Sequence, residues 1–224
     1  MKENKKIKIS IIKMIIIMLL FFFLPIIIKY ILAGVSQINN LQKLIITIIS
    51  NLVFIIIINI FYFKELKEDF NLFLKNKSKF LNITLFNWFI ALLISFILNL
   101  LLSKMGLGLS ENEIAIRNTF KNNFHFAFFN TVFLSPYIEE IVFRKSLYDS
   151  IYNKNIYLII ATVLFALLHV LGGGSVQEYL YLGSYLILSY SFAKSLKETQ
   201  NIYGNILVHS LHNFLAFLLI WGVK

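Results

Sequence analysis

The stretch MIIIMLLFFFLPIII, residues 14–28, contains no charged side chain. It approaches the roughly 20 apolar residues that an α-helix needs to cross a bilayer. The preceding MKENKKIKIS, residues 1–10, is basic, but the small-residue cleavage site of a secretory signal peptide is missing. We therefore predict that this stretch is a retained membrane span.

Similar apolar runs recur along the whole chain, which is 58% hydrophobic. Soluble domains are only about 45–50% apolar, even with glycine counted. Lipid offers no partner to an exposed backbone group, so the spans must be helices. We predict an all-α, polytopic transmembrane helix bundle of about seven spans, forming one integral membrane domain over residues 1–224. The expected spans are residues 11–33, 44–63, 80–103, 124–143, 156–171, 179–193 and 202–221, and residues 64–79 are expected to form a charged loop with an interfacial helical turn.

The net charge of +10 is distributed unevenly between the two sides of this predicted topology. Fifteen of the 21 basic residues fall on the side of the N-terminus: Lys2, Lys5, Lys6, Lys8, Lys13, Lys64, Lys67, Lys75, Lys77, Lys79, Arg144, Lys145, Lys154, Lys194 and Lys197. Because cytoplasmic loops collect Lys and Arg, we predict a multi-pass cell-membrane protein with a cytoplasmic N-terminus and an outer C-terminus. The charge is thus assigned to the lipid bilayer, with no nucleic-acid partner. The absence of cysteine excludes disulfides, thiol nucleophiles and Cys-based metal sites.

Ionisable groups within apolar runs are costly and rarely persist without a reason. In SPYIEEIVFRKS, residues 135–146, Glu140 and Arg144 are i,i+4 neighbours and can pair on a helix. Glu139 is rotated by about 100° from Glu140 and faces elsewhere. One carboxylate therefore has a partner while the other is free for chemistry; a simple ion pair at a helix end is the alternative.

Two later motifs place histidines inside spans. FALLH puts Phe165 and His169 one turn apart, and HSLHN does the same for His209 and Asn213, with His212 beside them. Interhelical hydrogen bonding is the structural alternative for these groups. Together with the glutamates, they form a set that could activate water and stabilise an oxyanion in a membrane cavity.

These motifs fit E-E-x-x-x-R, F-x-x-x-H and H-x-x-x-N, and in this order they resemble the CPBP family. That family contains the type II CAAX prenyl endopeptidases and the bacteriocin-processing or immunity (Abi) proteins, and residues 124–221 would be its core here. The resemblance implies glutamate-based, also described as metal-dependent, intramembrane proteolysis. Glu139 would be the general base and would activate water with His169, while His209 and Asn213 would stabilise the oxyanion. Glu140 and Arg144 would hold the helix end, and Phe165 would pack.

The cofactor and the depth of the site are less determined. Glu139, His169 and His209 could bind a divalent metal such as zinc, although we favour activation of water without a tightly bound metal. In simple spans, Glu139 and His169 would lie roughly 15 Å apart in depth at 1.5 Å per residue. We therefore expect the span of His169 to be sunk or to end at Gly172–Gly174 within a protein-lined cavity. Lys145 departs from the family pattern, which often has a small residue after the arginine.

Three functions follow from these observations. The first is an intramembrane endopeptidase acting on a membrane-embedded or lipid-modified peptide or protein. The second is a non-catalytic membrane-binding or bacteriocin-immunity protein of the same family. The third is a small transporter or channel, which the absence of an internal repeat disfavours. The chain has no H-E-x-x-H zinc motif and no G-x-G-D aspartyl motif, and Ser184 lacks the G-x-S-G context of a serine protease.

Overall fold

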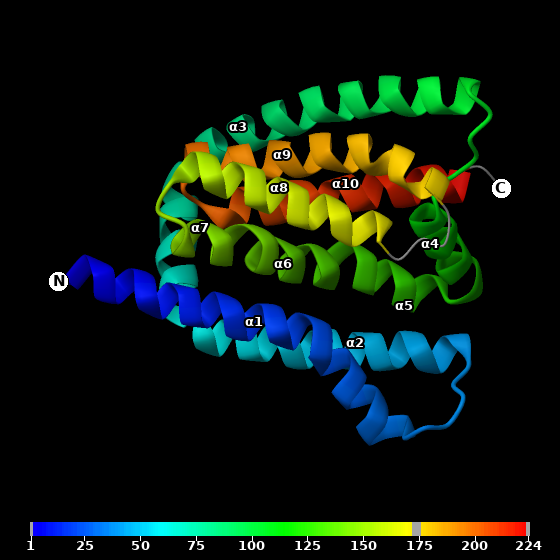
Figure 1. Cartoon of the computed structure of the whole chain (residues 1–224), viewed down its shortest axis with the longest axis horizontal. Helices are drawn as coiled ribbons and strands as arrows, with labels where there is room; N and C mark the ends of the chain where they lie inside the picture. Colours follow the sequence, from blue (N-terminus) through cyan, green and yellow to red (C-terminus); the bar gives the residue numbers. More distant parts are fainter. Residues whose placement is uncertain (1, 172–175, 223–224) are drawn as a thin grey trace.

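The computed structural model describes residues 2–171 and 176–222, and all regular elements within these ranges are helical (Figure 1). The predicted all-α bundle is thus confirmed. The long helices are α1 (Lys2–Ala33), α2 (Asn40–Phe61), α3 (Phe63–Lys104), α8 (Lys154–Val170), α9 (Leu182–Thr199) and α10 (Ile202–Gly222). A shorter helix, α4 (Glu111–Asn122), and a 3₁₀ turn, η3 (Val176–Tyr181), complete one end of the bundle.

The middle of the bundle is one long helical segment, Phe124–Ser150, built from several parts. Its α-helical parts are α5 (Phe124–Phe129), α6 (Ser135–Glu140) and α7 (Ser146–Ser150). Two single turns of π-helix separate them, η1 (Asn130–Leu134) and η2 (Ile141–Lys145). A π turn inserts one extra residue into an α-helix, and such turns are frequent at functional sites. The paired glutamates lie at the junction of α6 and η2.

Five of the described helical segments are long and apolar enough to cross a membrane, which makes this a multi-pass membrane protein. They are Ile7–Ala33, Asn40–Phe61, Phe63–Lys104, Phe124–Ser150 and Ile202–Ile220. The fifth predicted span is the shorter apolar helix α8. The sixth, expected at 179–193, is divided between η3 and α9, and α9 carries Lys194, Lys197 and Glu198 in its last turns. By length and composition alone, α9 is therefore not among the candidate spans.

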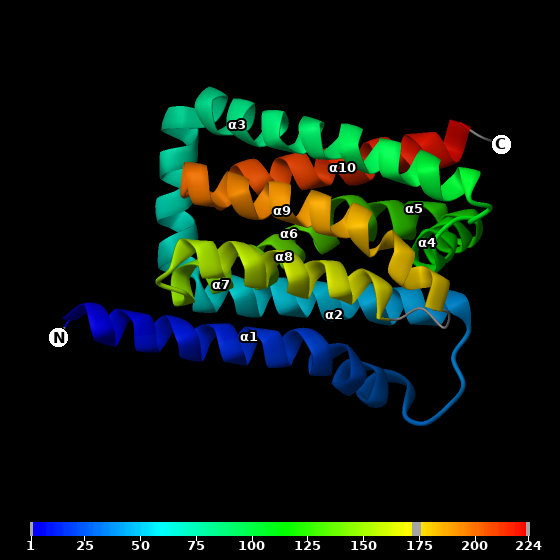
Figure 2. The ribbon, with the colours of Figure 1, turned by 45° about the horizontal axis from the view of Figure 1, so that its top comes forward.

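The long helices run back and forth between two ends of the bundle (Figure 1). The start of α1, the α2–α3 junction and the α9–α10 turn share one end, and the end of α10 lies at the other. The assignment of the first end to the cytoplasm rests on the lysine distribution. The prediction of a charged loop over residues 64–79 was wrong, because these residues belong to α3. The helix bends at Asn76, and its first part lies across the end of the bundle (Figure 2).

The main core joins helices from both halves of the chain. Ile17, Ile58, Ile141, Ala161 and Leu196 are completely buried in one cluster. They come from α1, α2, η2, α8 and α9 respectively, so the segment that carries the glutamates is enclosed on several sides. Local signals position the elements around this core. Helix α2, for instance, begins with a capping box, in which the backbone N–H groups of Asn39 and Gln42 each donate to the other residue's side-chain oxygen at 2.9 Å.

Candidate active site

The first predicted motif forms a buried ion pair. Glu140 and Arg144 are both completely inaccessible to solvent, and Glu140 Oε1 lies 3.4 Å from Arg144 Nη1. The guanidinium stacks 3.7 Å above the ring of Phe165, and its Nη2 donates to Ser189 Oγ at 3.3 Å. A buried charge is tolerated only when it is paired and hydrogen-bonded. The predicted pairing of Glu140 with Arg144 is present, and Phe165 packs against it.

Helix α10 adds two further partners to Glu140. His209 Nδ1 lies 2.9 Å from Glu140 Oε1, and Asn205 Nδ2 donates to Glu140 Oε2 at 3.1 Å. The amide of Asn205 also donates to the carbonyl of Phe192 at 2.7 Å, and the Phe192 ring stacks on the imidazole at 5.1 Å. Glu140 therefore fixes both the plane of His209 and its proton on Nδ1, as a carboxylate does for many functional histidines.

Glu139 has a different environment, as its rotation on the helix predicts. Its side chain is 20% exposed, and its Oε2 lies 3.8 Å from His209 Nε2. That separation is too long for a direct hydrogen bond but allows one water to contact both atoms. Glu139 also lines a cavity of about 210 Å³ between α1, α2 and the α5–α6 region. Of the four predicted catalytic residues, Glu139 is the one that lines this cavity.

The third predicted residue, His169, lies at the end of α8. Its Nδ1 is 2.9 Å from the carbonyl oxygen of Phe165, and its ring contacts Phe165 and Tyr185 at centroid distances of 4.4 and 4.9 Å. Phe165 in turn lies 6.0 Å from the His209 ring. Within the described ranges, His169 makes no hydrogen bond or ion pair with Glu139. The Phe165 ring thus contacts both imidazoles, that of His169 and that of His209.

The helix that carries His169, α8, is short. It has 17 residues, or about 25 Å at 1.5 Å per residue, against roughly 30 Å for a hydrocarbon core. A helix of this length ends within the depth of the bilayer, as the expected sunken or broken span requires. The predicted break at Gly172–Gly174 falls outside the described residues.

The remaining polar residues of α10 separate into two groups. Asn213, one turn beyond His209, donates from Nδ2 to the carbonyl of Thr131 at 2.8 Å. It therefore lies against the helical segment Phe124–Ser150 that carries the glutamates, called the motif helix below. His212 accepts a hydrogen bond from Trp88 Nε1 at 3.2 Å, on the side of α3. Asn213 retains one amide hydrogen for another acceptor. His212 has a structural partner away from Glu139.

A metal site is not formed by the described side chains in this arrangement. No three His, Asp or Glu residues within them are close enough to share an ion. A catalytic zinc needs three protein ligands around one point. The candidate set Glu139, His169 and His209 does not converge on one point here, although the contact between Nδ1 and Glu140 leaves His209 Nε2 available, as in a metal-bound histidine.

The family departure at Lys145 has a local compensation. Its ammonium group lies 3.2 Å from Asp69 of α3 and 3.3 Å from Asp149. The two carboxylates neutralise a lysine that is only 6% exposed. Lys145 therefore ties the motif helix to α3 and points away from Glu139, and the extra charge does not enter the candidate site.

Sequence reasoning missed the supporting residues of the site. Asn205, Phe192 and Ser189 were not singled out, although each contacts Glu140, His209 or Arg144. Asn205 and His209 are spaced i,i+4 on one helix face, and this spacing is the signal that could have revealed the asparagine. The contacts of α9 depend on how helices dock, which no local pattern encodes.

Comparisons with known proteins cover the segment that carries the three motifs. Residues 121–215 match the family described as type II CAAX prenyl endopeptidase Rce1-like. An uncharacterized protein of Mycoplasma capricolum subsp. capricolum is 30% identical over 126 residues, which cover 52% of this chain and 36% of that protein. The chain thus covers little more than a third of that relative's length. No solved structure gives a significant match. All three motifs lie within the matched segment and the resemblance they predicted is confirmed: residues 121–215 match the Rce1-like type II CAAX prenyl endopeptidases, consistent with the CPBP family.

Proposed function

We propose that this protein is an intramembrane endopeptidase that hydrolyses a peptide bond in a membrane-associated peptide or protein. One observation carries the proposal. The Glu139 carboxylate lies on a cavity wall, 3.8 Å from an imidazole nitrogen of His209 that the buried Glu140 holds in place. A carboxylate and an oriented imidazole close enough for one water to contact both are the parts that water activation needs.

In the proposed reaction, a water hydrogen-bonded to Glu139 attacks the carbonyl carbon of the substrate. Glu139 takes one proton from this water, and the carbonyl oxygen becomes the oxyanion of a tetrahedral intermediate. The C–N bond then breaks, and the amine leaves with the proton from Glu139. The new carboxylic acid passes the second proton of the water to the released amine and becomes a carboxylate. His209 and Asn213 supply the donors for the oxyanion. In its protonated form His209 donates from both nitrogens, to Glu140 through Nδ1 and to the oxyanion through Nε2.

The buried pair of Glu140 and Arg144 holds His209 in place for this role. Glu140 and Arg144 act as positioning residues in this mechanism, because neither would touch the substrate.

The role proposed for His169 requires a rearrangement. Its Nδ1 is engaged with the Phe165 carbonyl, so its Nε2 is the nitrogen that could reach a water or the substrate. Catalytic hydrogen bonds are often long without substrate and tighten in the complex. A metal, if one is used, would require the same movement, since it would have to bring His169, His209 and Glu139 together.

The absence of a direct hydrogen bond or ion pair between the described residues His169 and Glu139 also favours a second candidate function. A non-catalytic member of the family, which binds a membrane partner or confers bacteriocin immunity, would need the buried Glu140–Arg144–His209 core for its fold only. It would not need His169 in contact with Glu139. Measured hydrolysis of a peptide is the observation that distinguishes the two functions.

The test is hydrolysis of a pool of membrane-tethered peptides, with and without lipid modification, by purified protein in liposomes. Glu139→Gln should lower turnover by about 10²–10⁴-fold, the usual contribution of a general base. Glu198→Gln is the matched control, because Glu198 pairs with Lys194 on the exposed part of α9. Turnover by the wild type and the control but not by Glu139→Gln supports the peptidase. Full turnover by Glu139→Gln, or none by the wild type, refutes it.

A further inference from the structure

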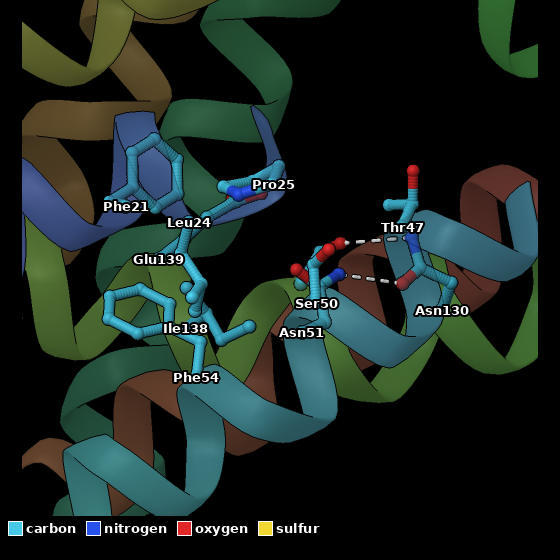
Figure 3. A pocket seen from close by; sticks show the side chains of 11 residues that line it. Phe21, Leu24, Pro25, Thr47, Ser50, Asn51, Phe54, Asn130, Ile138 and Glu139 are labelled. Atoms are coloured by element: carbon cyan, nitrogen blue, oxygen red, sulfur yellow. Dashed lines mark hydrogen bonds between the residues drawn. The ribbon is translucent and has the colours of Figure 1, made fainter. Parts of the chain in front are cut away.

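The cavity at Glu139 is built largely by the N-terminal helices, outside the segment that matches the family. Its walls are Phe21, Leu24 and Pro25 of α1, Thr47, Ser50, Asn51 and Phe54 of α2, and Asn130, Ser135, Ile138 and Glu139 of the motif helix (Figure 3). A volume of about 210 Å³ corresponds to roughly seven waters at about 30 Å³ each. A short length of peptide chain that reaches Glu139 would therefore pass along α2.

The cavity has one polar side and one apolar side. Figure 3 shows Ser50, Asn51 and Asn130 together on one side, and the rings of Phe21 and Phe54 on the other. The two ring centroids are 6.3 Å apart. This division suits an extended peptide, whose main chain and side chain require different surroundings.

The polar side is organised by a pair of carboxamides. Asn51 Nδ2 donates to Asn130 Oδ1 at 2.7 Å, and Asn130 Nδ2 donates to Ser135 Oγ at 3.4 Å. Across the part of the chain that the structure describes, no group donates to Asn51 Oδ1. A carboxamide offers two donor hydrogens and an acceptor oxygen, so Asn51 retains one N–H and its C=O. A peptide residue presents the complementary C=O and N–H.

The apolar side includes an interruption in the hydrogen bonding of α1. Pro25 lies inside this helix and has no N–H, so the carbonyl of Phe21 lacks its usual intrahelical donor. Phe21 and Pro25 both line the cavity.

We propose that Asn51, held by Asn130, binds the main chain of the substrate beside the scissile bond by a two-point contact between carboxamide and peptide. Helix α2 thereby becomes part of the substrate site. The inference rests on the proposed peptidase function. An asparagine pair that only joined two helices would use one N–H and one C=O. The remaining groups of Asn51 are those that the substrate engages.

The first experiment compares Asn51→Leu with Asn59→Leu in the liposome assay, using a peptide that the wild type cleaves. Asn59 is on the same helix and hydrogen-bonds the carbonyl of Ile55 and the hydroxyl of Tyr137, outside the cavity. The loss of two hydrogen bonds to substrate should raise KM by about tenfold or more in Asn51→Leu. The value of kcat should change little, as expected for an interaction made equally in ground and transition states. A purely structural role would lower the amount of active enzyme and leave KM unchanged.

The second experiment varies the substrate. Peptides are prepared in which one amide at a time, on either side of the scissile bond, is replaced by an ester, which removes a single N–H. One position should raise the wild-type KM severalfold, and the same replacement should have no further effect in Asn51→Leu. An unchanged KM in Asn51→Leu, or uniform tolerance of esters by the wild type, overturns the inference while the peptidase stands. Absence of any cleavage by the wild type refutes the proposed function and this inference with it.

Discussion

The two adjacent glutamates should differ sharply in what they contribute to stability. Glu140 is completely buried and contacts Arg144, His209 and Asn205. Glu140→Gln leaves the guanidinium of Arg144 buried without a counter-charge, and breaking one side of a buried pair costs about 3–5 kcal/mol. Glu139 is partly exposed and its carboxylate lies 3.8 Å from His209 Nε2, so Glu139→Gln should cost less than about 1 kcal/mol.

The assay is equilibrium unfolding in mixed micelles, with increasing mole fraction of denaturing detergent, followed by circular dichroism and tryptophan fluorescence. The double variant Glu140→Gln/Arg144→Met tests the cause. It removes both charges of the pair, so it should be less destabilised than the sum of the two single variants. Equal losses for Glu139→Gln and Glu140→Gln, or strict additivity in the double variant, would show that the buried pair does not determine stability here.

Three further predictions concern contacts around the site and can be measured by the same unfolding assay. Lys145→Met leaves its two aspartate partners without a cation and should destabilise the protein by about 3 kcal/mol or more, whereas a neutral result would mean that the ion pairs are not formed. Trp88→Phe removes the indole donor to His212, with an expected loss of about 1 kcal/mol and unchanged KM; loss of turnover with the fold intact would instead assign His212 to the active site. Gly204→Val should cost about 1–3 kcal/mol, because even a Cβ at Gly204 would lie 3.0 Å from Thr84 Oγ1 where α10 crosses α3, and a stable variant would argue against that close approach.

The parts of the site that local spacing encodes could be predicted from the sequence. The i,i+4 relation of Glu140 to Arg144 and the rotation of Glu139 away from it follow from helix geometry. The apolar runs determined the helical class in the same way. The interaction of Glu140 with His209 could not be predicted, because it depends on how α10 docks against the motif helix. The roles of Glu139, His169, His209 and Asn213 stay predictions until turnover is measured.

Two other differences from expectation have physical causes. Residues 64–79 look like a loop because they are highly charged, yet their charges alternate with apolar residues that α3 can bury, such as Leu66 and Phe73. Tertiary packing therefore overrides the composition. The π turns at η1 and η2 are also invisible in the sequence, since a single shifted backbone hydrogen bond needs no special residue type. The cavity wall formed by α2 became visible only when both halves of the chain were placed together.

The short length of α8 has a consequence for the surrounding lipid. At 17 residues it is shorter than the described spans, which have between 19 and 42 residues, and this creates hydrophobic mismatch along the flank that it forms. Ile156, Ile159, Val163 and Leu164 are exposed on this helix, so lipid would meet it directly. Acyl chains beside α8 must then be shorter or more disordered than those beside α2. Bilayer thickness would thus act on the helix that carries His169, and the protein should favour thinner membranes.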